Sequence, residues 1–155
     1  MRYRPGPILA PALACAALIA APAPAAPVAP AGVAVRIEVI NLRSSDGMVL
    51  ACMTAHRDHF PDCENDAGAY ALEVPAGTSV VLDFPAVMPG RYAISVLHDE
   101  NGNGKVDRML GLMPKEGYGF SRDAAVRFGP PSFRSAAFDV ADVAVRQTIR
   151  MRYMF

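Results

Sequence analysis

The chain has 155 residues, of which 52% are hydrophobic and 19% charged, and its 15 basic residues balance its 15 acidic ones. This length provides one domain with a hydrophobic core and no obvious second one. The balanced charge excludes the strongly basic class of nucleic-acid-binding proteins, so no nucleic-acid partner is expected.

The first 32 residues have the composition of an export signal and a linker. Two arginines precede a short apolar segment, and an Ala/Pro tract follows it. Residues 1–25 are therefore predicted to be a signal peptide cleaved before Ala26, and residues 26–32 a linker. A lipoprotein cleavage box ending at Cys15 is the alternative, although few apolar residues precede that position.

The export signal predicts where the protein is found and how it relates to the membrane. The apolar segment is shorter than the roughly 20 residues that a spanning helix needs. No later segment reaches that length either, so we expect no membrane span in the exported chain. We expect a periplasmic or secreted protein with a single domain over residues 33–155.

Removal of the signal peptide changes the cysteine and charge counts. Two cysteines remain, Cys52 and Cys63, with thirteen basic and fifteen acidic residues, a net charge of −2. An even pair of cysteines in an exported chain is usually oxidised, so we predict a disulfide between them. The bridge would close a short loop and stabilise the fold by about 2–3 kcal/mol.

From residue 33 onward, apolar and polar residues alternate in short segments separated by Gly- and Pro-rich turns, the pattern of half-buried strands. Residues 33–42 and 48–54 flank an Asp-Gly turn and are predicted to form a hairpin. The last segment, residues 145–153, places apolar residues on one face and mainly arginines on the other. Further strands are predicted over residues 70–74, 79–84, 91–98 and 137–140.

Six or seven short strands without a convincing helix predict an all-β fold, an antiparallel β-sandwich of Greek-key type. Residues 108–133 interrupt this pattern, because they are rich in Gly and Pro and show no sustained period. An unstructured segment of that length is uncommon in a compact domain and often functional. It presents Glu116, Tyr118 and Phe120, which we predict to be a ligand-contact loop for a glycan or peptide. The commoner arrangement is the alternative, with both aromatic rings packed back onto the sandwich.

The most specific motif is HDENGNGKVD at residues 98–107, in which oxygen-bearing side chains occupy alternate positions. Calcium takes six to eight oxygen ligands, which a loop supplies from alternating positions. We call residues 99–107 the acidic loop; it matches the first nine positions of the calcium loop D-x-[DN]-x-[DN]-G, with Gly104 at the sharp turn. The predicted calcium ligands are Asp99, Asn101, Asn103, the carbonyl of Lys105 and Asp107.

The match to the calcium motif fails beyond the acidic loop. Leu110 stands where a bidentate Glu belongs, although Glu116 could return to the site, and no helices flank the loop. Two carboxylates and two amides would make a weak site, suited to an extracellular calcium supply. The alternative without a metal is an exposed turn in which Asn and Asp side chains cap their own backbone.

A second group of metal-binding residue types lies between the two cysteines. His56, His59 and Cys63 are ligands that zinc and copper accept. However, the two histidines are closely spaced for a loop, and the predicted disulfide would use Cys63. Ordinary exposed histidines are therefore the expected arrangement.

A hydrolase site near His98, Asp99 and Ser121 is the main enzymatic alternative. Such a site needs a nucleophile, a base and an orienting group in contact. No nucleophile elbow or other ordered context joins these residues in the sequence. A structural imidazole at the end of a strand is the commoner role for His98.

Three stretches, GRYAISVLHDENGNGKVD, LGLMPKEGYGFSRDA and GPPSFRSAAFDV, together resemble DUF2141, a family of exported bacterial proteins of unassigned function. The resemblance covers residues 35–153. It implies a prealbumin-like β-sandwich, related in shape to the collagen-adhesin B-type repeats of surface proteins, several of which hold calcium in similar loops. The two cysteines and the GLMPKEG link depart from the commoner family form, and the family brings no catalytic residues.

These observations predict an exported, non-enzymatic β-sandwich module with a calcium-stiffened loop, acting in envelope binding or structure. Its partner is expected to be an envelope protein or a glycan. The alternatives are the periplasmic hydrolase and an accessory subunit that docks to an envelope complex by adding a strand at a sheet edge.

Overall fold

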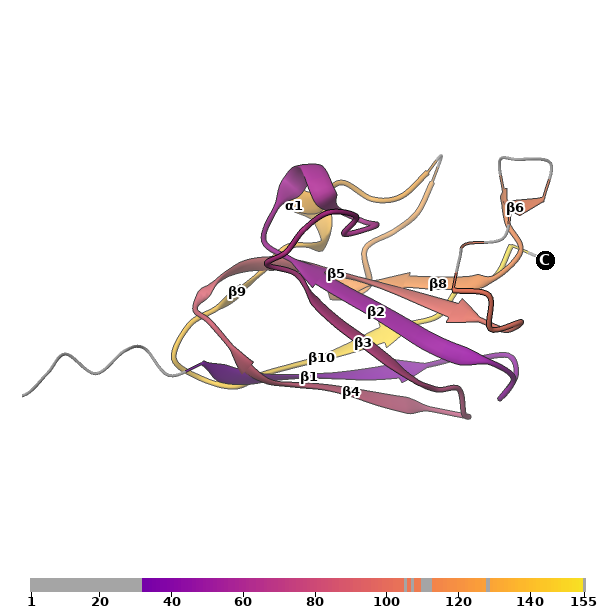
Figure 1. The fold of residues 1–155 in the computed structure, drawn as a ribbon, viewed down its shortest axis with the longest axis horizontal. Helices are drawn as coiled ribbons and strands as arrows, with labels where there is room; N and C mark the ends of the chain where they lie inside the picture. The colour runs from indigo at the N-terminus through magenta and orange to yellow at the C-terminus, as the bar shows by residue number, and fades with distance from the viewer. Residues whose placement is uncertain (1–31, 105, 107, 110–112, 128, 155) are drawn as a thin grey trace, which may run out of the picture.

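The computed structural model describes residues 32–154 apart from 105, 107, 110–112 and 128 (Figure 1). The predicted signal peptide, and all of the predicted linker except Gly32, lie outside this part of the chain. Among the described residues, no helix is long and apolar enough to cross a membrane.

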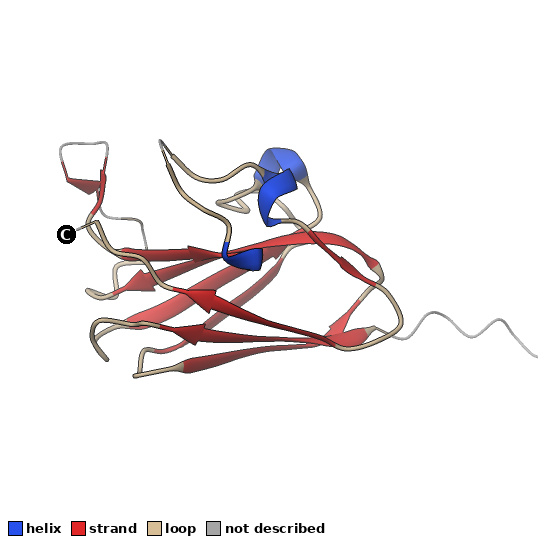
Figure 2. Ribbon diagram, turned by 180° about the vertical axis from the view of Figure 1, so that it is seen from behind, coloured by secondary structure: helices blue, strands red, loops and turns tan. Residues whose placement is uncertain are grey.

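Two sheets pack face to face as a β-sandwich, which Figures 1 and 2 show from opposite sides. The three-stranded sheet has the order β10 (Val145–Arg150), β1 (Val33–Ile40), β4 (Val80–Val87). The five-stranded sheet has the order β3 (Tyr70–Pro75), β2 (Met48–Thr54), β5 (Gly90–Asp99), β8 (Gly117–Phe120), and β9 (Phe138–Val140) pairs with the beginning of β5. A separate ribbon consists of β6 (Arg108–Met109) and β7 (Met113–Pro114).

The predicted all-β sandwich is confirmed, with one exception to its antiparallel pairing. β1 runs parallel to β10, from Val35 opposite Val145 to Ile40 opposite Arg150. The other named strand pairs are antiparallel. The first and last strands of the domain therefore lie side by side, which makes the three-stranded sheet mixed.

The core between the sheets is built from the apolar half of each alternating strand. In β1, Val35, Ile37 and Val39 are fully buried, while the residues between them are exposed. Successive side chains of a strand point to opposite faces of the sheet, so alternation buries one face. Burial of each large apolar side chain contributes on the order of 1.5–3 kcal/mol. The five-stranded sheet contributes Val49, Met53, Tyr92, Ile94 and Val96 to the same core.

The predicted hairpin of residues 33–42 and 48–54 is wrong. β1 pairs with β10 and β4, whereas β2 pairs with β3 and β5 in the other sheet. The chain leaves β1 through Asn41, whose φ of 64° turns the backbone and whose side-chain amide donates to the carbonyl of Met151 at 2.8 Å. Alternation of apolar and polar residues specifies only which face of a strand is buried. Two strands that pair in one sheet and two strands that face each other across the core therefore show the same pattern.

Residues 108–133 contain more structure than their composition predicts. They include β8, which pairs with β5, and a 3-10 turn over Ser121–Asp123. A one-turn helix, α1 (Phe133–Ala136), follows; the sequence predicted no helix there. β8 and β9 pair with successive parts of β5, so residues 121–137, which we call the excursion, leave the sheet and return to it. Figure 2 shows the short helices gathered over one side of the sandwich.

Candidate functional site

The acidic loop begins at the end of β5 and is wound around the side chain of Asp99. Asp99 is 1% exposed, and its two carboxylate oxygens accept hydrogen bonds from the backbone N–H groups of Asn103 at 3.1 Å and Gly104 at 2.6 Å. The side-chain oxygen of Asn101 accepts from the same Asn103 N–H at 3.0 Å. Gly102 and Gly104 have φ of 69° and 71°, a conformation that glycine adopts without strain.

Three of the five predicted calcium ligands, Asp99, Asn101 and Asn103, lie in this described part of the loop, with both amide residues exposed. Lys105 and Asp107 lie outside the described residues. Within the described residues, no group of three or more His, Cys, Asp or Glu side chains is arranged to hold a metal ion. Carboxylate and amide oxygens are nevertheless the donor types that calcium takes.

Glu116 lies at the base of the same loop. It precedes Gly117, which is opposite His98 in the last pair of the β5–β8 ladder, so Glu116 and Asp99 each lie one residue beyond that pair. Glu116 is only 4% exposed. The tertiary structure therefore brings a second buried acidic residue to the start of the acidic loop, as the sequence allowed.

Glu100 is turned away from the loop by Arg43. The Nε of Arg43 lies 3.0 Å from both carboxylate oxygens of Glu100, and the hydroxyl of Ser44 donates to one of them at 2.9 Å. These hydrogen bonds, chiefly those from Arg43, hold the pKa of Glu100 below its usual value. Glu100 thus ties the acidic loop to the turn that follows β1.

His98 is a structural residue in the interior. It is fully buried, and its Nε2 lies 2.9 Å from the carbonyl oxygen of Asp46. A carbonyl oxygen only accepts hydrogen bonds, so Nε2 carries the proton and Nδ1 accepts from the hydroxyl of Tyr153 at 2.8 Å. The Tyr153 hydroxyl in turn accepts from the backbone N–H of Arg43 at 3.1 Å, and burial raises its pKa.

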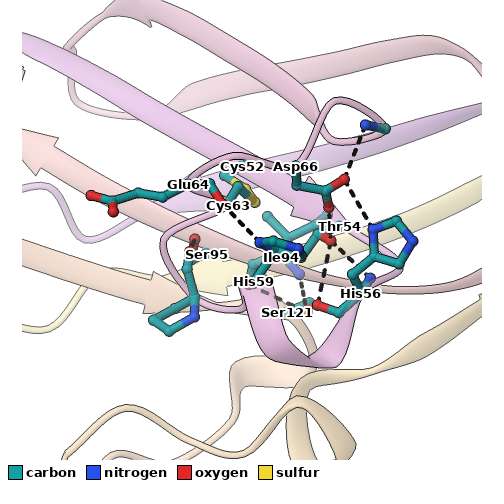
Figure 3. Close-up of a disulfide and its surroundings, with 12 residues drawn as sticks. Cys52, Thr54, His56, His59, Cys63, Glu64, Asp66, Ile94, Ser95 and Ser121 are labelled. Carbon is teal, nitrogen blue, oxygen red and sulfur yellow. Dashed lines mark hydrogen bonds and ion pairs between the residues drawn. A yellow bond between two sulfur atoms is a disulfide. The ribbon is translucent and has the colours of Figure 1, made fainter.

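Ser121 is also a structural residue. It is fully buried, and its hydroxyl accepts from the backbone N–H of Ile94 at 2.9 Å (Figure 3). The same hydroxyl donates to the carbonyl of Ala136 at 2.7 Å. The Ser121 hydroxyl therefore pairs with the backbone N–H of Ile94 at the point where β8 ends and the excursion begins.

The structure does not bring the predicted hydrolase residues together. Ser121 bonds Ile94, whereas His98 lies four residues further along β5, a separation of about 13 Å at the rise of a strand. Asp99 is engaged by the backbone of the acidic loop. The sequence favoured a structural role for His98 but identified neither its partners nor the role of Ser121, because each partner comes from a distant segment.

The predicted ligand-contact loop is strand β8. Tyr118 is half-buried, and Phe120 is 5% exposed with its ring centroid 5.8 Å from that of Phe60. The alternating glycines face the other way: a side chain at Gly117 would overlap the ring of Tyr153, and one at Gly119 would overlap Ile149. Strict alternation of Gly and aromatic residues therefore indicates a strand. The high Gly and Pro content of the whole segment concealed this pattern.

The predicted disulfide between Cys52 and Cys63 is formed, with Cα atoms 6.3 Å apart (Figure 3). It ties β2 to residues 55–69, the segment between β2 and β3, which we call the disulfide loop. In this loop the ring of His59 donates from Nδ1 to the carbonyl of Glu64 at 2.7 Å. The disulfide uses the sulfur of Cys63, so of the three predicted zinc or copper ligands only the two histidines keep a ligating atom.

A buried carboxylate organises the disulfide loop. Asp66 accepts hydrogen bonds from the hydroxyl of Thr54 and, at 3.0 Å, from the backbone N–H of Gly68, and its Oδ1 lies 2.9 Å from Nδ1 of His56 (Figure 3). Together these partners, with Thr54 first, lower the pKa of Asp66 to about 2. The site missed by the sequence analysis is thus a rigid, oxygen-rich turn beside the disulfide.

Comparison with known proteins gives one family match. The model of a family described as uncharacterized proteins conserved in bacteria, DUF2141, matches residues 37–148. No curated protein and no solved structure matches the chain, so the likeness to prealbumin-type sandwiches stays a prediction.

Proposed function

The chain belongs to the DUF2141 family of uncharacterized bacterial proteins, and from this premise we propose that it is an exported, non-enzymatic β-sandwich module whose acidic loop binds calcium. We propose that the module acts in binding or structure at the cell envelope. Export rests on the signal-peptide composition of residues 1–25.

One observation carries the calcium proposal: the Asp99 carboxylate is buried at the centre of a loop whose backbone is already folded around it. Each carboxylate oxygen has further lone pairs beyond the one that a backbone N–H uses. Asn101 and Asn103 add amide oxygens from the same loop, and Glu116 adds an acidic residue from the adjacent strand.

The proposal of a non-enzymatic role is supported by how the two candidate catalytic residues are used. His98 and Ser121 are both fully buried, and the polar atoms of both make hydrogen bonds that hold the fold together. A general base or a nucleophile needs those same atoms for its substrate.

Calorimetric titration of the purified protein with calcium tests the proposal. We expect a dissociation constant on the order of 10⁻⁴ to 10⁻³ M, typical of extracellular calcium modules, and a rise in melting temperature with calcium concentration. The variant Asp99→Asn should lose both responses, while Asp142→Asn, which removes an exposed carboxylate elsewhere, should keep them. Absence of heat and of a calcium-dependent melting shift in the unmodified protein would refute calcium binding.

A further inference from the structure

We propose that two adjoining clefts on the outer face of the five-stranded sheet bind an acidic oligosaccharide through four arginines. The clefts lie where the excursion meets the disulfide loop. This inference names a ligand class for the envelope-binding role proposed above and rests on that role for the export of the chain. The four arginines are Arg57, Arg122, Arg127 and Arg134.

The scaffold of this face is a small second core. Outward-facing residues of the five-stranded sheet, Ala93 and Phe120, are covered by residues of the excursion and of the disulfide loop. The ring centroid of Phe60, from the disulfide loop, lies 5.8 Å from that of Phe120 and 6.0 Å from that of Phe133 in α1. Three segments distant in sequence are therefore held together. The smaller of the two clefts lies between the disulfide loop and the excursion, whereas the larger is lined by the excursion alone.

The two clefts are large enough for a ligand of several rings. One has a volume of about 660 Å³ and includes Arg122 and Arg127 in its lining. The other, of about 500 Å³, is lined by Arg57, Arg134 and the rings of Phe60 and Phe133. Pro131 lines both, so they adjoin. Sites of this size hold small molecules rather than single ions.

The four cleft arginines differ from several other arginines of the protein in their ion pairing. Arg36, Arg43 and Arg91 each form an ion pair with a carboxylate. In the part of the chain that the structure describes, none of the four cleft arginines does. Asp123, the carboxylate residue that lines the larger cleft, is paired with Arg152 at 2.9 Å. Arg122 donates from one Nη to the carbonyl of Ala137 at 3.4 Å. Its other N–H groups and the other three guanidinium groups remain available to an anionic ligand, whose carboxylates their planar fork matches.

The sequence of this part of the chain also has an excess of positive charge. Residues 117–155 contain six arginines and three aspartates, although the exported chain is expected to carry a net charge of −2. Positive charge is thus concentrated in the part of the chain that forms the excursion and the last strand. Three of these arginines, Arg122, Arg127 and Arg134, lie in the excursion, and their charge attracts anions to this face.

The backbone at the edge of the larger cleft is strained. Arg122 and Asp123, two consecutive residues other than glycine, have φ of 58° and 50°. Residues other than glycine are strained in this conformation, and strain of this kind concentrates at sites that clamp ligands. The conformation is held because the backbone N–H of Arg122 donates to the side chain of Gln147 at 2.9 Å.

The chemistry of the lining favours an acidic oligosaccharide over a nucleic acid. The smaller cleft combines two arginines with two aromatic rings, so it offers apolar surface beside positive charge. A nucleic acid carries a dense line of phosphates, which a chain with an overall negative charge does not match. An acidic sugar chain spreads its carboxylates between rings that have apolar faces.

Binding of hexagalacturonate to the purified protein, measured by calorimetry with EDTA present, tests this inference. Maltohexaose is the uncharged comparison, and a single-stranded DNA hexamer is the comparison of another class. We expect hexagalacturonate to bind, more weakly as salt is raised, and the other two to bind at least tenfold more weakly. The double variant Arg122→Gln, Arg127→Gln should weaken hexagalacturonate binding at least tenfold. The double variant Arg36→Gln, Arg91→Gln removes the same charge from positions that line neither cleft and should leave binding within twofold.

The inference is overturned if hexagalacturonate does not bind, if DNA binds more tightly, or if both double variants weaken binding equally. Circular dichroism checks that the variants fold, which we expect because all four substituted side chains are exposed. EDTA removes free calcium, so glycan binding is measured independently of calcium binding by the acidic loop. Loss of glycan binding with an intact calcium response removes the cleft site only, and the opposite result removes the loop proposal only.

Discussion

The hydroxyl of Tyr153 lies 2.8 Å from Nδ1 of His98, joining the end of the chain to the strand that carries the acidic loop. The same hydroxyl accepts the backbone N–H of Arg43, and the guanidinium of Arg43 lies 4.5 Å from the centroid of the Tyr153 ring. A fully buried imidazole is thereby satisfied at both nitrogens. Three distant segments are held together beneath the loop.

Substitution Tyr153→Phe should destabilise the protein by about 1–3 kcal/mol, because it leaves the buried Nδ1 of His98 without a donor. Urea unfolding measures the loss. Tyr118→Phe is the matched control, since within the described residues its hydroxyl makes no hydrogen bond, and it should change stability by less than about 0.5 kcal/mol. Equal stability of the Tyr153 variant and the unmodified protein would contradict the assigned hydrogen bond.

Substitution Ser121→Ala should cost about 1–3 kcal/mol, because the buried N–H of Ile94 and carbonyl of Ala136 each lose a partner. Hydrogen exchange at the Ile94 amide should accelerate as well, since the excursion is no longer held to β5 at this point. Ser79→Ala removes an exposed hydroxyl and serves as the control. Unchanged exchange at Ile94 would show that Ser121 does not hold the excursion.

Asp66 should make the protein acid-sensitive in a defined range. Its pKa falls from 3.8 to about 2 on folding, so its contribution is fully present above about pH 4 and is lost as the pH falls through about 2. The melting temperature of Asp66→Asn should therefore be lower than that of the unmodified protein at pH 7, and the gap should shrink below pH 4. Asp62→Asn, an exposed neighbour in the disulfide loop, should show no such gap. A gap that stays constant down to pH 2 would be inconsistent with this titration.

The double substitution Cys52→Ser, Cys63→Ser should destabilise the fold by about 3 kcal/mol, because it frees the loop that the disulfide closes in the unfolded chain. Reduction of the unmodified protein with dithiothreitol should produce a similar loss. The reductant should leave the double variant unchanged, which shows that it acts through this bond. Resistance of the unmodified protein to full reduction would refute the stabilising role.

Substitution Gly119→Ala should cost about 1–3 kcal/mol, because the new methyl group overlaps the side chain of Ile149 in the packed core. Gly77→Ala is the control, since a methyl group there meets only an ordinary contact with the carbonyl of Ser79. Thermal unfolding of both variants separates the two cases. Equal melting temperatures would mean that the last strand does not approach β8 closely.

The sequence alone was sufficient for the all-β class, for most strand positions and for the disulfide. These features are local: alternation of apolar side chains specifies a strand with one buried face, and Cys52 and Cys63 are the two cysteines that follow the predicted signal peptide. The loop around Asp99 was also visible, because glycines and Asx side chains at fixed offsets specify a turn.

The pairing of strands and the use of the polar residues depended on the folded chain. β1 and β2 alternate like a hairpin yet lie in different sheets, and His98, Ser121 and Glu100 each take partners more than 25 residues away. Whether an arginine is neutralised or available also depends on what folds beside it, as Arg36 and Arg127 illustrate. A periodic pattern of apolar and polar residues indicates which face of a strand is buried. Which strand or side chain lies beside it is decided only when distant segments pack. That packing formed the clefts and the base of the acidic loop.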